Sequence, residues 1–357
     1  MKPLPLWIIA ALSWTVATDE IYADIRESRS FHILEPTKAP VSQVSWATDR
    51  IVVSGSRTRW AQAFDVETGK ELWRKEFPKP ISSLTCSTKH VFLTTDSSDD
   101  SIQRLGLETG EDTTPKESSL KTTSKTKVGS TRIGSPGVFL WNEACQALCV
   151  LQHELTMNSE EKSHSVRNRL FLHSPDSLNA RPTIDYTGSS NPLASCDGTT
   201  LLLAERESQS CTLVDLSTGT GTLIYGPPLP EVAPEDLGGS CDTPALSNAF
   251  SSPEGSFIRV VDNFWSGGDI HFHPKSALPS KLHFPQGHII AAVHWPTQRL
   301  LVSGMTTNLT LCNTSGEILE KLKNVTGARV WSMAFSPNGK KAAALNEKGE
   351  IKIFEIP

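Results

Sequence analysis

The chain has 357 residues, with 34 basic and 39 acidic side chains and a formal net charge of -5. This length suits one large domain or two ordinary ones, and the mild acidity disfavours general binding to nucleic acid or to an anionic membrane. The seven cysteines form neither a paired framework nor a CxxC zinc knuckle; they are Cys86, Cys145, Cys149, Cys196, Cys211, Cys241 and Cys312. A composition rich in turn formers and poor in helix formers favours strands.

The N-terminus allows two interpretations. Lys2 and the apolar residues 4–12 precede small residues near Ala17, which is the pattern of a secretory signal peptide. However, residues 8–14 recur as residues 289–295 with five of seven identical, and a cleaved leader has no reason to match a strand of the mature protein. We therefore favour a repeat strand at residues 8–14, and residues 1–17 remain either a first blade or a signal peptide. The apolar run is too short to span a bilayer.

Internal repeats continue through the chain. Residues 46–55 match residues 295–304 at six of ten positions, and each copy reads as a strand ending in an aromatic residue, a polar turn and a second strand closing at glycine. Further strands run into Thr-Gly turns at residues 64–69, 105–110 and 214–219. The last unit, residues 330–356, reads as strand, Pro-Asn-Gly turn, strand, turn, strand.

Such units without intervening helices predict an all-β protein, a β-propeller of seven or eight four-stranded blades in one domain spanning residues 1–357. Eight candidate first strands begin near residues 8, 42, 81, 132, 192, 244, 288 and 329. Because Pro357 follows the third strand of the last unit, we expect residues 1–7 to supply its fourth strand. Three polar stretches, residues 111–130, 155–168 and 227–239, are expected to be mobile loop insertions.

The final unit resembles the WD40-repeat family. Its first strand and turn are similar to residues 330–339. The Trp-Asp position of the family falls at Phe354-Glu355 and at Asp65, and its Gly-His opening is matched by Gly287-His288. No unit of the chain carries both motifs. The resemblance and the repeats together imply structural positions at Trp14, Trp46, Asp65, Asp215, His288, Trp295, Phe335 and Phe354. A WD40-like ring would offer its faces and rim as separate docking surfaces for proteins.

Candidate chemistry is sparse. His271 and His273 alternate around Phe272, so both are expected on one face of a strand, but no neighbouring ligand completes a metal site and we expect no metal. We find no GxSxG nucleophile elbow and no phosphate-binding glycine loop, so neither catalytic residues nor a cofactor are expected. Residues 64–73 also resemble the blade signature of quinoprotein dehydrogenases, a single copy that supports only an alternative. The basic residues 116–132 are expected to be a solvated loop, with regulation by phosphorylation left open.

The sequence therefore favours a non-enzymatic protein–protein interaction scaffold that holds partners within a multi-protein complex in the cytoplasm or nucleus. Trp60 and Trp265 lie outside the repeat positions and are the candidate interaction surface. The expected partners are other proteins rather than nucleic acid, with no membrane span. The alternative is a secreted or periplasmic propeller, ligand-binding or quinoprotein-like, that begins with a signal peptide.

Overall fold

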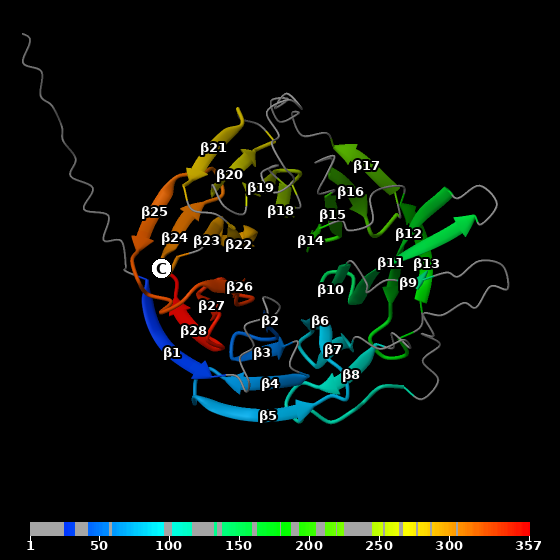
Figure 1. Cartoon of the computed structure of the whole chain (residues 1–357), viewed down its shortest axis with the longest axis horizontal. Coiled ribbons are helices and arrows are strands. Elements are labelled where there is room, and N and C mark those ends of the chain that lie inside the picture. Colours follow the sequence, from blue (N-terminus) through cyan, green and yellow to red (C-terminus); the bar gives the residue numbers. More distant parts are fainter. Residues whose placement is uncertain are drawn as a thin grey trace, which may run out of the picture.

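The chain folds into a ring of small antiparallel sheets (Figure 1). The computed structural model describes residues 25–32, 42–56, 59–95, 102–115, 132–133, 138–158, 163–178, 180–186, 193–204, 211–218, 220–224, 245–252, 254–263, 267–275, 278–285, 288–304 and 306–357. Seven sheets form from these residues, so the chain is a seven-bladed β-propeller and the predicted fold class is confirmed. Within the described ranges, the short 3-10 helix η2 (Trp295–Thr297) is the helical element.

The blades follow one another along the chain. Blade 1 contains β2 (Ser42–Trp46), β3 (Ile51–Ser56), β4 (Trp60–Asp65) and β5 (Lys70–Glu76), and blade 2 contains β6 (Ile81–Cys86), β7 (His90–Thr95) and β8 (Gln103–Gly106). Blade 3 contains β10 (Val138–Asn142), β11 (Ala147–Asn158), β12 (Ser163–His173) and β13 (Ala180–Tyr186), with β9 (Arg132–Ile133) beside β11. Blade 4 contains β14 (Leu193–Asp197), β15 (Thr200–Ala204), β16 (Cys211–Asp215) and β17 (Thr220–Ile224).

Three blades complete the ring. Blade 5 contains β18 (Ala245–Ser251), β19 (Phe257–Asn263), β20 (Gly267–His273) and β21 (Ser280–Phe284). Blade 6 contains β22 (Ile290–His294), β23 (Arg299–Ser303), β24 (Leu309–Asn313) and β25 (Ile318–Leu322). Blade 7 contains β26 (Val330–Phe335), β27 (Lys341–Asn346) and β28 (Glu350–Glu355), and its fourth strand is β1 (Arg26–His32).

The ring closes with seven blades. The innermost strands β2, β6, β10, β14, β18, β22 and β26 each contact the next, and β26 contacts β2. No place is left between these strands for an eighth blade. The eighth candidate strand, near residue 8, and the repeat position Trp14 lie outside the described residues.

Closure depends on a different segment from the one expected. Strand β1 pairs antiparallel with β28, from Arg26 opposite Glu355 to His32 opposite Glu350. Its one buried side chain, Phe31, packs against Phe64 of blade 1 with ring centroids 4.9 Å apart. The prediction that residues 1–7 supply this strand is therefore wrong.

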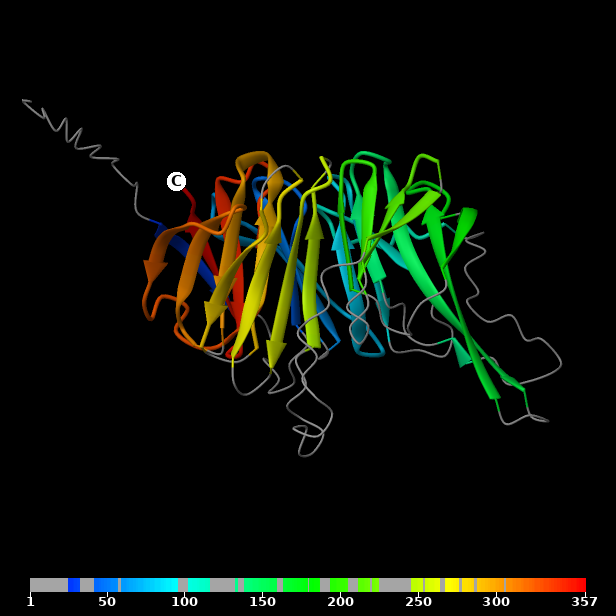
Figure 2. The same ribbon diagram turned by 90° about the horizontal axis from the view of Figure 1, so that it is seen from above.

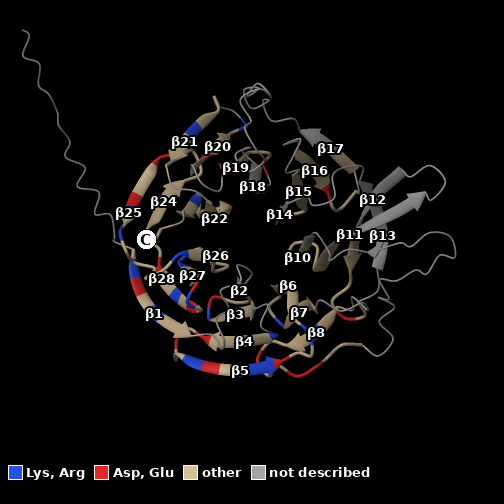
Figure 3. Cartoon of the chain, viewed as in Figure 1, with Lys and Arg blue, Asp and Glu red and all other residues tan. Residues whose placement is uncertain are grey.

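The middle strands are apolar because both faces of each blade are buried against a neighbour. In β3, Val53 joins the core between blades 1 and 2, whereas the next residue toward the N-terminus, Val52, joins the core between blades 1 and 7. Both side chains are fully buried. The rim strands β1 and β5 instead carry charges of both signs (Figure 3), and some pair locally, as Arg74 does with Glu71 at 2.6 Å.

The predicted loop insertions differ from expectation where the structure describes them. Residues 155–158 and 163–168 belong to strands β11 and β12, so the prediction of a loop at residues 155–168 is wrong for them. The start of the 111–130 stretch lies along β8, where the Gly106 amide donates to the Glu111 carbonyl at 2.9 Å. Residues 116–130 and 227–239 lie outside the described residues.

Candidate interaction surface

The two faces of the ring differ in their connections. On the short-turn face, tight turns join the first strand of a blade to the second, such as residues 47–50 in blade 1 and 336–340 in blade 7. On the opposite face, which we call the arm face, β17 ends and β18 begins, and the β11–β12 hairpin extends beyond the ring (Figure 2, green).

The projecting part of this hairpin, residues 154–158 and 163–167, is called the arm. Strands β11 and β12 stay in register from Leu148 opposite His173 to Asn158 opposite Ser163. Strand β10 pairs with β11 only as far as Leu151, and β13 pairs with β12 only from Asn168 onward. Beyond the ends of β10 and β13 the arm therefore continues as the β11–β12 pair, with β9 beside β11 at Glu154 and Leu155.

An open depression of about 440 Å³ lies among the ends of β18, β22 and β26, where Phe250, Val293 and Phe335 contribute apolar surface. His294 also lines it, but its Nε2 lies 2.9 Å from the Pro337 carbonyl oxygen. This histidine therefore ties blade 6 to blade 7.

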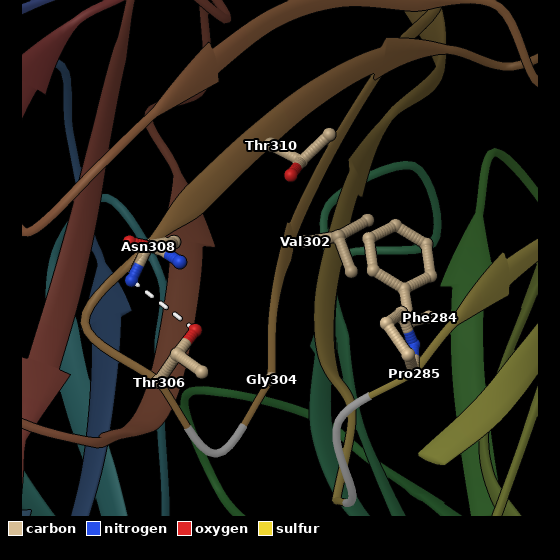
Figure 4. Close-up of a pocket in the computed structure, with 7 residues that line it drawn as sticks. All are labelled: Phe284, Pro285, Val302, Gly304, Thr306, Asn308 and Thr310. Atoms are coloured by element: carbon tan, nitrogen blue, oxygen red, sulfur yellow. Dashed lines mark hydrogen bonds between the residues drawn. The ribbon is translucent and has the colours of Figure 1, made fainter.

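A smaller pocket of about 70 Å³ lies between blades 5 and 6 on the arm face (Figure 4), lined by Phe284, Pro285, Val302, Gly304, Thr306, Asn308 and Thr310. The Asn308 amide donates to Thr306 Oγ1 at 3.3 Å. None of the seven lining residues is charged, and no nucleophile is paired with a base among them. A volume of this size suits about two water molecules.

The sequence-derived interaction residues are not brought together among the described residues. Trp60 opens β4 and is half-buried, opposite Glu76 of β5. Trp265 lies outside the described residues. The arm, by contrast, carries no aromatic residue and was expected to be a loop.

Most of the predicted repeat positions hold the blades together. We call the contact between two neighbouring blades a seam. Trp46 is buried, and its Nε1 donates to the Ala334 carbonyl of blade 7 at 3.0 Å across the seam that closes the ring. Trp295 packs against the core between blades 5 and 6, and Phe335 against the core between blades 6 and 7. Phe354 is fully buried in the same core as Phe335.

Asp65 and Asp215 each organise the turn after a third strand. The carboxylate of Asp65 accepts hydrogen bonds from the amides of Glu67 and Thr68, and that of Asp215 accepts one from the Ser217 amide. Arg50 donates from Nε to Asp65 Oδ2 at 3.0 Å, and this bond holds the pKa of the Asp65 carboxyl far below its usual range.

Asn313 forms the same kind of turn in blade 6, where the sequence shows a divergent fourth copy of the Thr-Gly turn at Ser315-Gly316 but the role of Asn313 was not assigned. Its Oδ1 accepts hydrogen bonds from the amides of Ser315 and Glu317. The signal was present, because an Asn three residues before Gly316 can make the turn that an Asp makes elsewhere.

His288 reaches across a seam. Its backbone is left-handed, with φ of 46°, and its Nδ1 lies 3.5 Å from Oδ2 of Asp262 in the preceding blade. The same oxygen accepts a hydrogen bond from the Ile289 amide at 2.8 Å. The carboxylate partner therefore comes from blade 5 and not from the hairpin of blade 6 that follows Gly304.

His271 and His273 lie on one face of β20, as the alternation predicts. Their rings are roughly parallel with centroids 6.3 Å apart, and His273 stacks on Phe257 at 4.3 Å. Burial, followed by the charge of the buried Arg259, lowers the pKa of His273 to about 4. A neighbouring guanidinium opposes cation binding, and no group of three or more potential metal ligands occurs in the described ranges.

Comparison with protein-family models and with curated proteins finds no match to this sequence. In the described part of the chain, no helix is both long and apolar enough to cross a membrane.

Proposed function

We propose that the chain is a non-enzymatic scaffold of the WD40-like type, which holds partner proteins within a multi-protein complex in the cytoplasm or nucleus. The asymmetry of the ring is the observation that supports this most strongly. Polar side chains such as His294 and Asp262 are engaged in seams and turns, while the arm projects from one face. A rigid ring with one elaborated face suits the holding of partners at fixed geometry.

Purification of the tagged chain from its native cell, under mild conditions and in two successive affinity steps, tests this proposal. We expect other proteins to co-purify in fixed ratios and the chain to elute well above its own 39.0 kDa on gel filtration. A variant with residues 154–167 replaced by an Asn-Gly hairpin turn should lose a subset of them while the ring stays folded. Recovery of the wild-type chain alone would refute the scaffold proposal.

A secreted or periplasmic ligand-binding propeller is the second candidate. The 440 Å³ depression, with Phe250 and Phe335 in its lining, has the size and partly apolar character of a small-molecule site. The N-terminal sequence of the mature protein separates the two candidates. A start at Met1 or Lys2 supports the scaffold, and a start near Thr18 supports export.

A further inference from the structure

Three basic side chains of blade 5 face blade 4. Ile270 and Phe272 of β20 pack in the core between blades 5 and 6. The alternate residues of this strand, His271 and His273, therefore point the other way, toward blade 4. Arg259 lies directly opposite His271 on β19 and points to the same side. The seam between blades 4 and 5 thus holds a guanidinium and two imidazoles on one face.

These three side chains are withdrawn from water. Arg259 is 1% exposed and His273 is 8% exposed, while His271 is half-buried. Both imidazole Nε2 atoms are buried, and neither has a hydrogen-bond partner in the described part of the chain. In the imidazolium form each ring carries an N–H at Nε2, which here is a buried donor without an acceptor.

Neighbouring charges add to the cost of protonation. Burial, followed by the charge of Arg259, lowers the pKa of His271, and Asp269 acts in the opposite direction. The Asp269 carboxylate is already bonded to His283 at 2.8 Å and to Lys281 at 3.0 Å. Strands β15, β17 and β18 carry no titratable group. The other strands of the two blades carry Cys196, Asp197, Cys211, Asp215, Arg259, Asp262, Asp269, His271, His273, Lys281 and His283.

The apolar contact across this seam is made largely by small side chains. Among the described residues, its buried core consists of Leu202, Ala204, Cys211, Ala249 and Val261. Alanine and cysteine bury little apolar surface, so little hydrophobic free energy opposes separation of the two blades. We propose that the seam between blades 4 and 5 is an acid-sensitive closure of the ring, which opens when His271 and His273 are protonated while other seams stay packed. This goes beyond the scaffold proposal, because it assigns a conformational response to one place in the ring.

Buried cysteines report individual seams. Cys211 lies in the seam between blades 4 and 5, Cys86 in that between blades 1 and 2, and Cys312 in that between blades 5 and 6. The full chain is treated with dithiodipyridine, a disulfide that reacts with thiols in mild acid, and mass spectrometry identifies the labelled residues. We expect the ratio of the Cys211 labelling rate to the Cys312 labelling rate to rise at least tenfold from pH 7 to pH 4.5, because local opening exposes only Cys211.

Removal of the imidazoles makes the test specific to this cluster. His271→Gln combined with His273→Gln leaves polar side chains that do not titrate, so this variant should show no rise in the ratio. His271→Gln alone, at a half-buried position, should show a smaller rise than wild type and keeps the test valid if the double variant does not fold. The matched control is His90→Gln, which removes a half-buried histidine of blade 2 and should keep the full rise.

Three outcomes overturn the assignment. The first is a constant labelling ratio in the wild-type chain across this pH range. The second is a full rise that persists in both glutamine variants. The third is equal acceleration at Cys86, Cys211 and Cys312, which would mean that acid unfolds the whole ring rather than one seam.

Discussion

Ring closure by β1 is open to a direct stability measurement. Deletion of residues 1–32 removes β1, whereas deletion of residues 1–24 keeps it, so the difference between the two variants isolates this segment. The segment buries Ile25 and Phe31, which are 5% and 6% exposed. Burial of each such side chain contributes about 1.5–3 kcal/mol, so we expect a loss of about 3–6 kcal/mol. Such a loss is a large share of the ~5–15 kcal/mol that usually stabilises a domain.

Urea unfolding followed by tryptophan fluorescence and by circular dichroism gives the free energy of unfolding of both variants. A point substitution supplies a second measure, since Phe31→Ala should cost about 3–5 kcal/mol, whereas His32→Ala, at an exposed position of the same strand, should cost little. Equal unfolding midpoints for the two deletions, together with a neutral Phe31→Ala, would show that β1 does not close the ring.

Three further predictions concern the turns and seams. The folded pKa of His273, about 4, lies below the ordinary value of 6.5, so the buried neutral imidazole contributes its full stability above pH 6.5. As the pH falls from 6.5 toward 4, the free energy of unfolding should drop by about 3 kcal/mol on this account. Urea unfolding across this range should show a shallower dependence of that free energy on pH for His273→Gln than for wild type. Asp65→Ala should lower the free energy of unfolding by about 2 kcal/mol, and Asp215→Ala should lower it by less than half of that. Of these two residues, only Asp65 is both buried and bonded to a guanidinium. Equal losses for the two variants in chemical denaturation would contradict this. Trp46→Phe, which leaves a seam carbonyl without its donor, should cost about 1–3 kcal/mol in thermal unfolding, with Trp60→Phe as the near-neutral comparison.

The sequence predicts the blades well where both faces of a strand are buried. The expected starts near residues 42, 81, 192, 244, 288 and 329 fall within two residues of β2, β6, β14, β18, β22 and β26. The second strand of each blade, such as β15 or β23, is packed on both sides and is a run of apolar residues, and this run marks where the blade lies in the sequence. The start near residue 132 is the exception, because Arg132–Ile133 forms β9 and the first strand of blade 3 begins at Val138.

The segments that were misassigned are those where burial does not dictate the residue type. Strand β1 lies on the rim with one buried side chain, Phe31, so it has no apolar alternation to distinguish it from a loop. The arm pairs through its backbone beyond β10 and β13, and a polar sequence satisfies that ladder as well as an apolar one. The sequence also could not identify the carboxylate partner of His288. Asp262 lies 26 residues earlier, in another blade, and only the closed ring brings the two side chains together.

The contrast between seams and arm bears on how the scaffold would work. The Trp141 amide of β10 donates to Thr85 Oγ1 of blade 2, and Asn142 Nδ2 donates to the Gly198 carbonyl of blade 4, so blade 3, from which the arm extends, is tied to both neighbouring blades at its short-turn end. A recognition element on a fixed base loses less conformational freedom on binding than a loop does. A partner bound there is thus held at a set orientation relative to the rest of the ring, which is the physical requirement of a scaffold.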